Sequence, residues 1–332
     1  MNKEILLKSR PKGRPTKDNF EINDIEKPEP KDGEVLLKSK YVSVDPYMRG
    51  RMRDEKSYVP PFEINEPIRG GIIAEVIESK NENFKKGDYV NGSNLQWKIL
   101  QTSNGDDLKK VDGNQAPLSA YLGVLGLTGL TAYVGLKNIG NLKEGETLVV
   151  SGGSGAVGSI VGQIGKIKGC KVVGIAGSDD KVETMKKKFG FNGGINYETT
   201  DNMKKAIKEA CPNGVDVYWD NVGGETLDAA LANINKHGRV INCGAISMYN
   251  DTEAKKGPRH ESTLVKKSVR MQGFIVRDHQ DEFEEGIQHI AKWMNEGKIK
   301  YSETVVEGFD NIPQAFIDLF DGKNEGKMVV EI

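Results

Sequence analysis

Three glycines at fixed spacing have the most specific chemical use of any residues in this sequence. Gly153, Gly155 and Gly158 follow the apolar run Thr147–Ser151 in a G-x-G-x-x-G pattern, and apolar residues then recur at helical spacing from Val157 to Ile164. A strand is therefore expected to enter the turn and a helix to leave it. Such glycines let the N–H groups of a helix N-terminus approach a pyrophosphate without Cβ atoms in the way. The pattern predicts a dinucleotide-binding turn, with a flexible glycine turn as the alternative.

The end of the next strand bears on which dinucleotide is bound. Lys171–Ala176 is followed by Gly177 and Ser178, where an Asp or Glu would receive the ribose hydroxyls of NAD. Without that carboxylate there is room for a 2′-phosphate, and Lys181 offers a point charge to pair with it. The sequence therefore predicts NADPH rather than NADH. Asp179 and Asp180 weaken this assignment, and a solvated helix lysine is the other interpretation.

The histidines and cysteines are placed unfavourably for catalytic zinc. All seven lie at or beyond residue 170: His237, His260, His279, His289, Cys170, Cys211 and Cys243. In a dehydrogenase of this architecture, thiolate or imidazole ligands would have to come from the N-terminal part of the chain. No metal site is expected. Hydride addition to a conjugated double bond then needs only positioning and a hydrogen-bond donor for the substrate carbonyl, such as a tyrosine or a ribose hydroxyl.

Composition limits the class of partner. The chain has 332 residues with 47 basic and 48 acidic side chains, so two domains are expected and nothing favours nucleic acid or an anionic membrane. The separated cysteines fit a reducing cytosol, and no apolar leader for export is expected at residues 1–10. The uncharged stretch Gly113–Leu136 contains Pro117 and several glycines, which favours a buried helix at a domain junction over a membrane span.

The elements that must position these residues change along the chain. Residues 1 to about 120 contain short β-type runs, such as 34–38 and 72–77, between turn signals. From Thr147 strands alternate with amphipathic helices, which predicts βαβ units and a parallel sheet. The expected strands are Thr147–Ser151, Lys171–Ala176, Gly194–Tyr197, Val215–Asp220, Arg239–Gly244 and Val269–Val276. The expected helices are Asp179–Gly190, Thr200–Ala210, Glu225–Ile234 and Asp278–Glu296, and the tail is expected to form a strand near Thr304, a helix from Pro313 to Phe320 and a strand from Lys327 to Ile332.

Six segments spread over nearly the whole chain resemble one known family. They are Val44–Gly50, Gly129–Tyr133, Gly155–Ser159, Asp220–Gly224, Gly244–Asn250 and Arg270–Val276. In this order they resemble the zinc-independent medium-chain dehydrogenases/reductases of the prostaglandin reductase group, also called leukotriene hydroxydehydrogenases or alkenal/enone double-bond reductases, with bacterial curcumin-reductase-like members. The resemblance implies an α/β fold with a Rossmann doubly wound parallel sheet and a GroES-like, mainly β catalytic domain. The expected boundaries are 1–125 for the catalytic domain, 126–298 for the NADPH-binding domain and 299–332 for a tail that returns to the catalytic domain.

The resemblance also implies an activity and a set of binding residues. The activity is NADPH-dependent reduction of the C=C bond of an α,β-unsaturated ketone or aldehyde, in a cytoplasmic homodimer that pairs through edge strands near Val269–Val276. The matching cofactor positions are Thr131, Gly155, Ala156, Val157, Gly158, Ser178, Lys181, Tyr197, Asn221, Cys243, Gly244, Ala245, Ile246, Ser247, Tyr249, Phe274, Ile275, Val276 and Asn324. Tyr47 matches an active-site tyrosine, and a packing role for it is the alternative.

One position departs from the family pattern. Animal and plant members carry a tyrosine eight residues before the phenylalanine that corresponds to Phe274, and here that residue is Lys266. The hydrogen bond to the substrate carbonyl would then come from Tyr47, Tyr249, the cofactor ribose or water. A quinone reductase of the same superfamily and a non-catalytic NADPH-binding redox sensor are the competing functions, because fold alone does not fix function.

Overall fold

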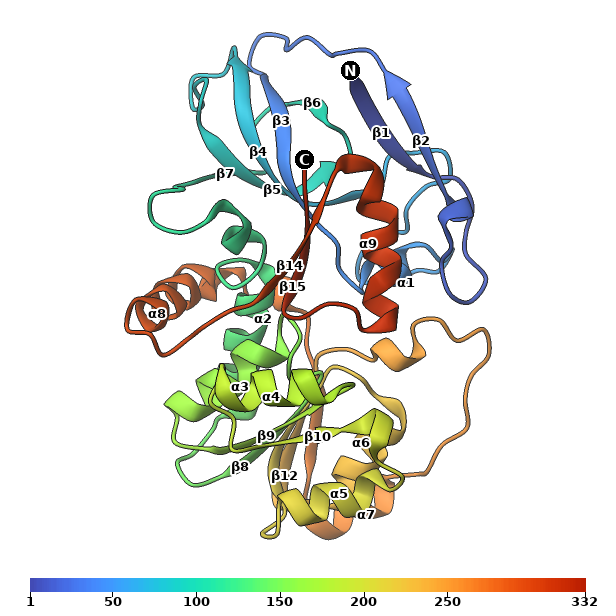
Figure 1. The fold of residues 1–332 in the computed structure, drawn as a ribbon, viewed down its shortest axis with the longest axis vertical. Helices are drawn as coiled ribbons and strands as arrows, with labels where there is room; N and C mark the ends of the chain where they lie inside the picture. The colour runs from blue at the N-terminus through green and yellow to red at the C-terminus, as the bar shows by residue number, and fades with distance from the viewer. The chain divides into compact units, whose positions relative to one another are not determined.

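The computed structural model describes residues 1–332 and divides into two compact units (Figure 1). Unit 1 contains residues 1–123, 304–324 and 328–332, and unit 2 contains residues 124–303 and 325–327. Most of the C-terminal tail thus belongs to the same unit as the N-terminus. The short piece 325–327 belongs to the other unit.

Unit 1 is built around antiparallel strands. Its larger sheet has the order β14-β15-β3-β4-β5-β7, with β6 also pairing with β3, and β1 pairs separately with β2. The strands are β1 Asn2–Leu7, β2 Phe20–Ile25, β3 Val35–Ser43, β4 Arg69–Ser79, β5 Tyr89–Gln96, β6 Leu100–Ser103, β7 Leu108–Val111, β14 Glu303–Glu307 and β15 Lys327–Glu331. The expected runs 34–38 and 72–77 fall on β3 and β4, and the tail returns because β15 pairs with β3 from Val329 opposite Ser43.

Two helices complete the core of unit 1. The short helix α1 spans Met48–Arg51, and α9 spans Ile312–Asp318 before a 3-10 turn at Leu319–Asp321. Phe316 of α9 is fully buried and packs edge-on against Phe20 of β2, with ring centroids 6.3 Å apart. This aromatic packing joins the tail helix to the N-terminal hairpin.

Unit 2 contains the parallel sheet that the sequence predicts. Its order is β10-β9-β8-β11-β12-β13, and all neighbouring strands in it are parallel. The strands are β8 Thr147–Ser151, β9 Lys171–Ala176, β10 Gly193–Asn196, β11 Val215–Asp220, β12 Ile234–Asn242 and β13 Arg270–Gly273. Successive strands run outward from β8 on one side and from β11 on the other. The expected doubly wound α/β class is confirmed.

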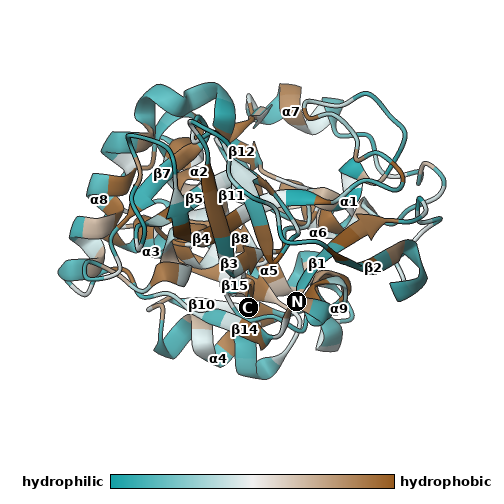
Figure 2. Ribbon diagram, turned by 90° about the horizontal axis from the view of Figure 1, so that it is seen from above, coloured by the Kyte–Doolittle hydropathy of each residue, from teal (hydrophilic) through white to brown (hydrophobic).

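Helices cover the sheet of unit 2. They are α2 Leu127–Gly135, which continues as a π-helical turn to Gly140, α3 Gly158–Ile167, α4 Asp179–Lys187, α5 Met203–Ala210, α6 Gly224–Ala232, α7 Glu261–Lys267 and α8 Phe283–Asn295. Ile207 of α5 and Leu231 of α6 pack with sheet residues such as Val149 and Val240 in one core. The strands carry much of the hydrophobic colour in Figure 2, whereas α4 is largely hydrophilic.

Two expected elements near the end of unit 2 are corrected. The strand predicted over Val269–Val276 ends at Gly273, because its only partner β12 ends at Asn242, directly opposite Gly273. The helix predicted over Asp278–Glu296 is a 3-10 turn, Val276–Glu282, followed by α8. The 3-10 segment is itself interrupted at His279, which has non-helical dihedrals of φ −120° and ψ 35°. All four residues of β13 are exposed at the sheet edge.

The uncharged stretch Gly113–Leu136 contains a 3-10 helix at Leu118–Leu122 and most of the buried helix α2. No helix in the structure has the length and apolar character needed to cross a membrane.

Candidate functional site

The glycine turn lies at the centre of the parallel sheet. It connects β8 to α3, and β8 has β9 on one side and β11 on the other. The winding of the sheet reverses between β8 and β11. Open parallel sheets bind their ligands beyond the carboxyl ends of the strands at such a point.

The turn has the shape of an anion cradle. A Cβ atom on Gly158 would lie 2.2 Å from the Gly152 carbonyl oxygen, and one on Gly153 would lie 2.6 Å from Met185 Sδ. The amides of Ala156 and Val157 donate no hydrogen bond within the protein, and the positive end of the α3 dipole follows them. Amides at a helix N-terminus that have no acceptor within the protein fit a pyrophosphate.

A short piece of the C-terminal tail is anchored against this turn within unit 2. The Gly326 amide donates to the Ser154 carbonyl at 2.8 Å, and Gly326 forms a parallel bridge with Gly155. Gly326 has φ +63°, and a Cβ there would lie 1.8 Å from the Ser302 carbonyl oxygen. Only glycine fits this position. Asn324, which the family resemblance assigns to the cofactor, lies two residues before this anchor.

Side chains from α3 and α4 hold the same tail. Gln163 donates to the Lys300 carbonyl at 2.7 Å and accepts from the Lys300 amide at 2.7 Å. The Glu325 carboxylate accepts from Ser302 Oγ at 2.8 Å and from Thr184 Oγ1 at 3.1 Å. The tail is therefore fixed to the two helices that border the glycine turn.

The carboxyl end of β9 carries the residues expected to choose the cofactor. Ser178 caps α4 by accepting from the Lys181 amide at 3.3 Å. Burial lowers the pKa of Lys181, while the nearby Glu325 carboxylate acts to raise it. The Asp179 carboxylate, whose negative charge disfavours a phosphate at this place, accepts a hydrogen bond from Asn196 Nδ2 at 2.8 Å. A half-buried cation beside a helix N-terminus fits a phosphate monoester.

Tyr197 forms a wall next to this cation. A Cβ on Gly177 would lie 2.6 Å from the Tyr197 hydroxyl oxygen, so glycine lets the ring lie against the end of β9. Tyr197 nevertheless keeps 46% of its surface exposed. An exposed ring face beside Ser178 and Lys181 is suited to stacking on a planar base.

The loop after β11 is held by internal hydrogen bonds. Asn221 donates from Nδ2 to the Ser151 carbonyl at 2.7 Å and accepts at Oδ1 from Trp219 Nε1 at 3.0 Å. Its backbone amide donates to Ser151 Oγ at 2.9 Å. The side-chain amide of Asn221 is thus already engaged by β8 and β11, so this residue shapes the loop.

Asp220 holds the same loop through hydrogen bonds to its backbone amides. Its Oδ1 accepts from the amides of Val222 at 3.1 Å and Gly223 at 2.9 Å, and its backbone carbonyl accepts from the amides of Cys243 and Gly244. Sequence reasoning included Asp220 only as part of a motif and assigned it no role. A carboxylate at the end of an apolar strand, directly before Asn-Val-Gly-Gly, is the signal that could have identified it.

The segment after β12 closes on itself over the β11 loop. The Tyr249 hydroxyl accepts from the Ala245 amide at 3.2 Å, while Ile246 and Ser247 donate to the carbonyls of Asn221 and Val222 at 3.2 Å each. Burial raises the pKa of the Cys243 thiol to about 12, so it stays protonated. The structure therefore brings Asn221 together with 243–249.

Phe274 packs beside this segment. Its ring lies edge-on to Trp219 of β11, with centroids 5.9 Å apart at 74°. A Cβ on Gly135 of α2 would lie 2.5 Å from the Trp219 ring and 2.7 Å from Phe274. Ile275 and Val276 directly follow, where the chain leaves β13. Thr131, one turn before Gly135, donates its hydroxyl to the Leu127 carbonyl at 2.7 Å.

Tyr47 lies in unit 1, immediately before α1, where its ring packs partly buried against the core of that unit. This placement fits the packing interpretation, and the active-site role of the Tyr47 hydroxyl group stays a prediction. Lys266, at the position of the family tyrosine, lies exposed on α7.

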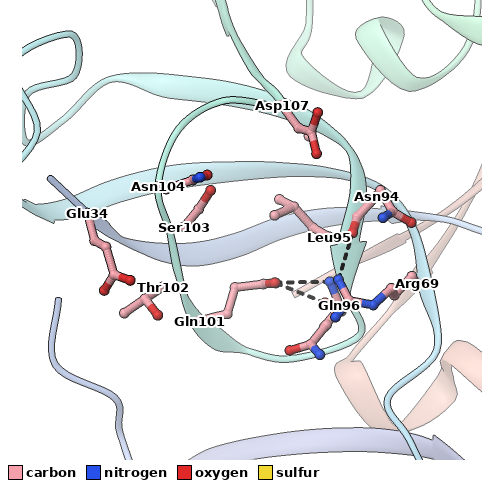
Figure 3. Close-up of a pocket in the computed structure, with 11 residues that line it drawn as sticks. Glu34, Arg69, Asn94, Leu95, Gln96, Gln101, Thr102, Ser103, Asn104 and Asp107 are labelled. Atoms are coloured by element: carbon pink, nitrogen blue, oxygen red, sulfur yellow. Dashed lines mark hydrogen bonds between the residues drawn. The ribbon is translucent and has the colours of Figure 1, made fainter. Parts of the chain in front are cut away.

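Unit 1 also has a surface pocket of about 390 Å³. It is lined by Glu34, Arg69, Gly92, Asn94, Leu95, Gln96, Gln101, Thr102, Ser103, Asn104 and Asp107 (Figure 3). The Gln101 side chain bridges the Gln96 backbone, accepting from its amide at 3.0 Å and donating to its carbonyl at 2.8 Å. None of the predicted site residues lines this pocket. No group of three or more His, Cys, Asp or Glu side chains is arranged to hold a metal ion.

Family models match both parts of the chain. Residues 3–111 match the N-terminal domain of oxidoreductase, and residues 156–292 match a model described as zinc-binding dehydrogenase. The second description refers to zinc, yet residues 1–169 contain no histidine or cysteine.

Relatives are similar along almost their entire length. The putative NADP-dependent oxidoreductase YfmJ of Bacillus subtilis is 54% identical over 99% of this chain and 97% of its own. The NADPH-dependent curcumin reductase of Escherichia coli is 43% identical over 100% of this chain and 97% of its own. The NADP-dependent 2-alkenal reductase of Nicotiana tabacum is 40% identical over 100% of this chain and 97% of its own.

A solved structure agrees with the fold at similar identity. The crystal structure of CurA from Vibrio vulnificus in complex with NADPH superimposes with a TM-score of 0.94 and 43% identity, over 99% of this chain and 98% of that one. The relatives named for NADP or NADPH and this complex establish NADPH as the cofactor. The cradle at Gly153–Gly158 and the cation at Lys181 fit it.

Proposed function

From the premise that the chain belongs to the zinc-independent reductases of the medium-chain dehydrogenase/reductase family, we propose that it reduces the carbon–carbon double bond of α,β-unsaturated ketones and aldehydes. It is an NADPH-dependent oxidoreductase. The observation that carries the proposal is the full-length similarity to a curcumin reductase and a 2-alkenal reductase. Both named substrates have a double bond conjugated to a carbonyl group.

The proposed reaction is a conjugate addition. Bound NADPH would supply the hydride for this reaction: a C–H bond would form at the β-carbon, and the π electrons would move to the carbonyl oxygen as an enolate. A proton from a hydroxyl or water then completes the α-carbon. The protein must position the substrate and donate a hydrogen bond to the oxygen that gains charge.

We assign this donor role to Tyr47 or Tyr249. Tyr249 is held close to the Ala245 amide beyond the carboxyl end of β12, and Tyr47 begins the helix α1 of unit 1. A donor aimed at the developing oxyanion in a dry site is worth about 3 kcal/mol. Tyr47→Phe should therefore lower kcat by roughly a hundredfold and leave the Kd for NADPH unchanged. Tyr121→Phe is the matched control in unit 1, because it loses one hydrogen bond to the Asp112 carbonyl.

An acceptor panel tests the activity itself. NADPH consumption is followed with an enone, an enal, a quinone and a saturated ketone, and the product is examined by NMR after the reaction with 4-deuterated NADPH. We expect turnover of the enone and the enal with deuterium at the β-carbon. Turnover of the quinone alone would identify a quinone reductase. Tight NADPH binding with no turnover of any acceptor would identify a non-catalytic binding protein.

A further inference from the structure

The buried carboxylate of Asp220 lies at the end of a central strand of the parallel sheet, and all its hydrogen-bond donors are neutral. We propose that Asp220 is a positioning residue that also makes the site favour the oxidised over the reduced cofactor, and so promotes hydride release. This inference rests on the use of NADPH and is independent of the identity of the substrate.

Asp220 is the last residue of β11 and only 1% exposed. Besides the two loop amides, its Oδ1 accepts from the Tyr218 hydroxyl at 3.0 Å and from Ser151 Oγ at 3.2 Å, and its Oδ2 accepts from Asn242 Nδ2 at 3.3 Å. All five partners are neutral donors. No lysine or arginine forms an ion pair with it.

These contacts describe a carboxylate held in its charged form. Both oxygens accept hydrogen bonds and neither donates one, which is the arrangement of an ionised group. Burial raises the pKa of Asp220 above its ordinary value, and the hydrogen bonds from Gly223, Val222, Tyr218 and Ser151 reduce this rise without cancelling it. The hydrogen-bond geometry is that of a negative charge surrounded by dipoles, without a counterion.

The topology places this charge at the redox end of the cofactor site. The pyrophosphate cradle follows β8, and the residues suited to the phosphorylated adenosine end, Ser178 and Lys181, follow β9. A dinucleotide that crosses the switch point must extend its other end over β11 and β12. Asp220 ends β11, and its backbone carbonyl holds the amides of Cys243 and Gly244 beyond β12.

The charge matters because the two forms of the cofactor differ there. Loss of a hydride changes the nicotinamide from neutral to positively charged, while the other parts of the molecule keep their charges. A fixed negative charge in a poorly solvated site lowers the free energy of the positive form more than that of the neutral form. Removing the charge should therefore weaken NADP⁺ binding more than NADPH binding.

The test is the ratio of two dissociation constants in Asp220→Asn. The amide keeps the size of the carboxylate and an oxygen that can accept the loop hydrogen bonds, so the charge is the main change. Kd values for NADP⁺ and NADPH are measured by protein fluorescence without substrate. We expect the ratio Kd(NADP⁺)/Kd(NADPH) to rise about tenfold, the size of a charge interaction at intermediate distance and an effective permittivity of about 20. An equal change in both constants would overturn the proposal and leave Asp220 a purely structural role.

Two further variants separate charge from shape. Tyr218→Phe removes one hydrogen bond to Oδ1 and keeps the charge, so the ratio should stay at the wild-type value. The double variant Asp220→Asn/Asn242→Asp moves the carboxylate to its neighbour on β12 and should restore the ratio to within about threefold. If Asp220→Asn does not fold, the double variant decides the question. A raised ratio of Kd(NADP⁺) to Kd(NADPH) in the double variant would overturn the proposal. All of these constants are obtained without an acceptor, so failure of enone reduction would not affect them.

Discussion

The two sides of the switch point in unit 2 are prepared for a ligand in different ways. At the end of β9, Lys181 is half-buried near the Glu325 carboxylate, and Tyr197 is 46% exposed. At the ends of β11 and β12, Asp220 and Asn221 are hydrogen-bonded to neighbouring strands and loops. The first side offers side-chain charge and a ring face, and the second offers backbone held in a fixed shape.

This difference implies two kinds of specificity. A side chain that meets the ligand directly discriminates between ligands that differ in one group, such as a 2′-phosphate. A side chain that only shapes the backbone, such as Asn221, affects all ligands of the same outline equally, and it contributes to protein stability because its hydrogen-bonding groups are buried. The proposed charge of Asp220 adds discrimination only between ligands that differ in charge near it. Substitutions on the two sides should therefore produce opposite patterns in affinity and stability.

Gly158→Ala should have the largest effect, because this glycine begins α3 at the turn after β8, which lies between the two sides. The added Cβ would lie 2.2 Å from the Gly152 carbonyl oxygen, a backbone atom that cannot move without displacing the cradle. Overpacking typically costs about 1–3 kcal/mol, so we expect NADPH and NADH to bind up to roughly a hundredfold more weakly. Calorimetry measures both constants. Gly257→Ala is the control, because nothing lies within 4 Å of a Cβ there, and binding equal to this control in Gly158→Ala would refute the cradle.

Lys181→Ala should show the pattern expected of the β9 side. Loss of a charge-assisted contact of roughly 1.5–3 kcal/mol raises KM for NADPH about tenfold to a hundredfold. KM for NADH should change little, because NADH lacks the 2′-phosphate. The melting temperature should fall less than in Asn221→Ala, because Lys181 is only half-buried.

The control for this variant lies on the same helix. Lys186 pairs with Glu183 at 2.7 Å, exposed on α4, so Lys186→Ala tests for a general loss of positive charge. Equal KM changes for NADPH and NADH in Lys181→Ala would mean that another residue recognises the phosphate.

The predictability of the two sides from sequence also differs, for a physical reason. The glycine turn and Lys181 follow local rules: spacing, a preceding strand, and the missing acid at Ser178. The inner strands of the sheet, β8, β9, β11 and β12, were expected for a similar reason, because buried parallel strands are short apolar runs. The Asp220 network joins β8, β11 and β12, which are separated by tens of residues, so the local motif can mark Asp220 but cannot indicate its partners.

The misplaced element ends have the same origin. The sequence predicts a strand from Val269 to Val276, but the strand ends where its partner β12 ends, at Asn242. Likewise, nothing in the sequence of the tail indicates that Gly326 pairs with Gly155 or that Gln163 grips Lys300. Strand lengths and tail docking depend on partners that are distant in sequence.

Asn221→Ala should show the smallest change in affinity and the clearest pattern of the β11 side. The substitution leaves the Ser151 carbonyl and Trp219 Nε1 without their partners, so the free energy of unfolding should fall by about 1–3 kcal/mol. The Kd values for NADPH and NADH should rise by the same small factor, since the loop loses shape and no phosphate contact is removed. Asn233→Ala is the matched control: its side chain donates to the carbonyls of Lys204 and Ala229 before β12 begins, so it should lower stability without changing either Kd. Denaturant unfolding and fluorescence titration on the same samples measure stability and the two Kd values. A selective loss of NADPH affinity in Asn221→Ala would show that the β11 side also contacts the group that distinguishes the two cofactors. The contrast between the two sides would then not hold.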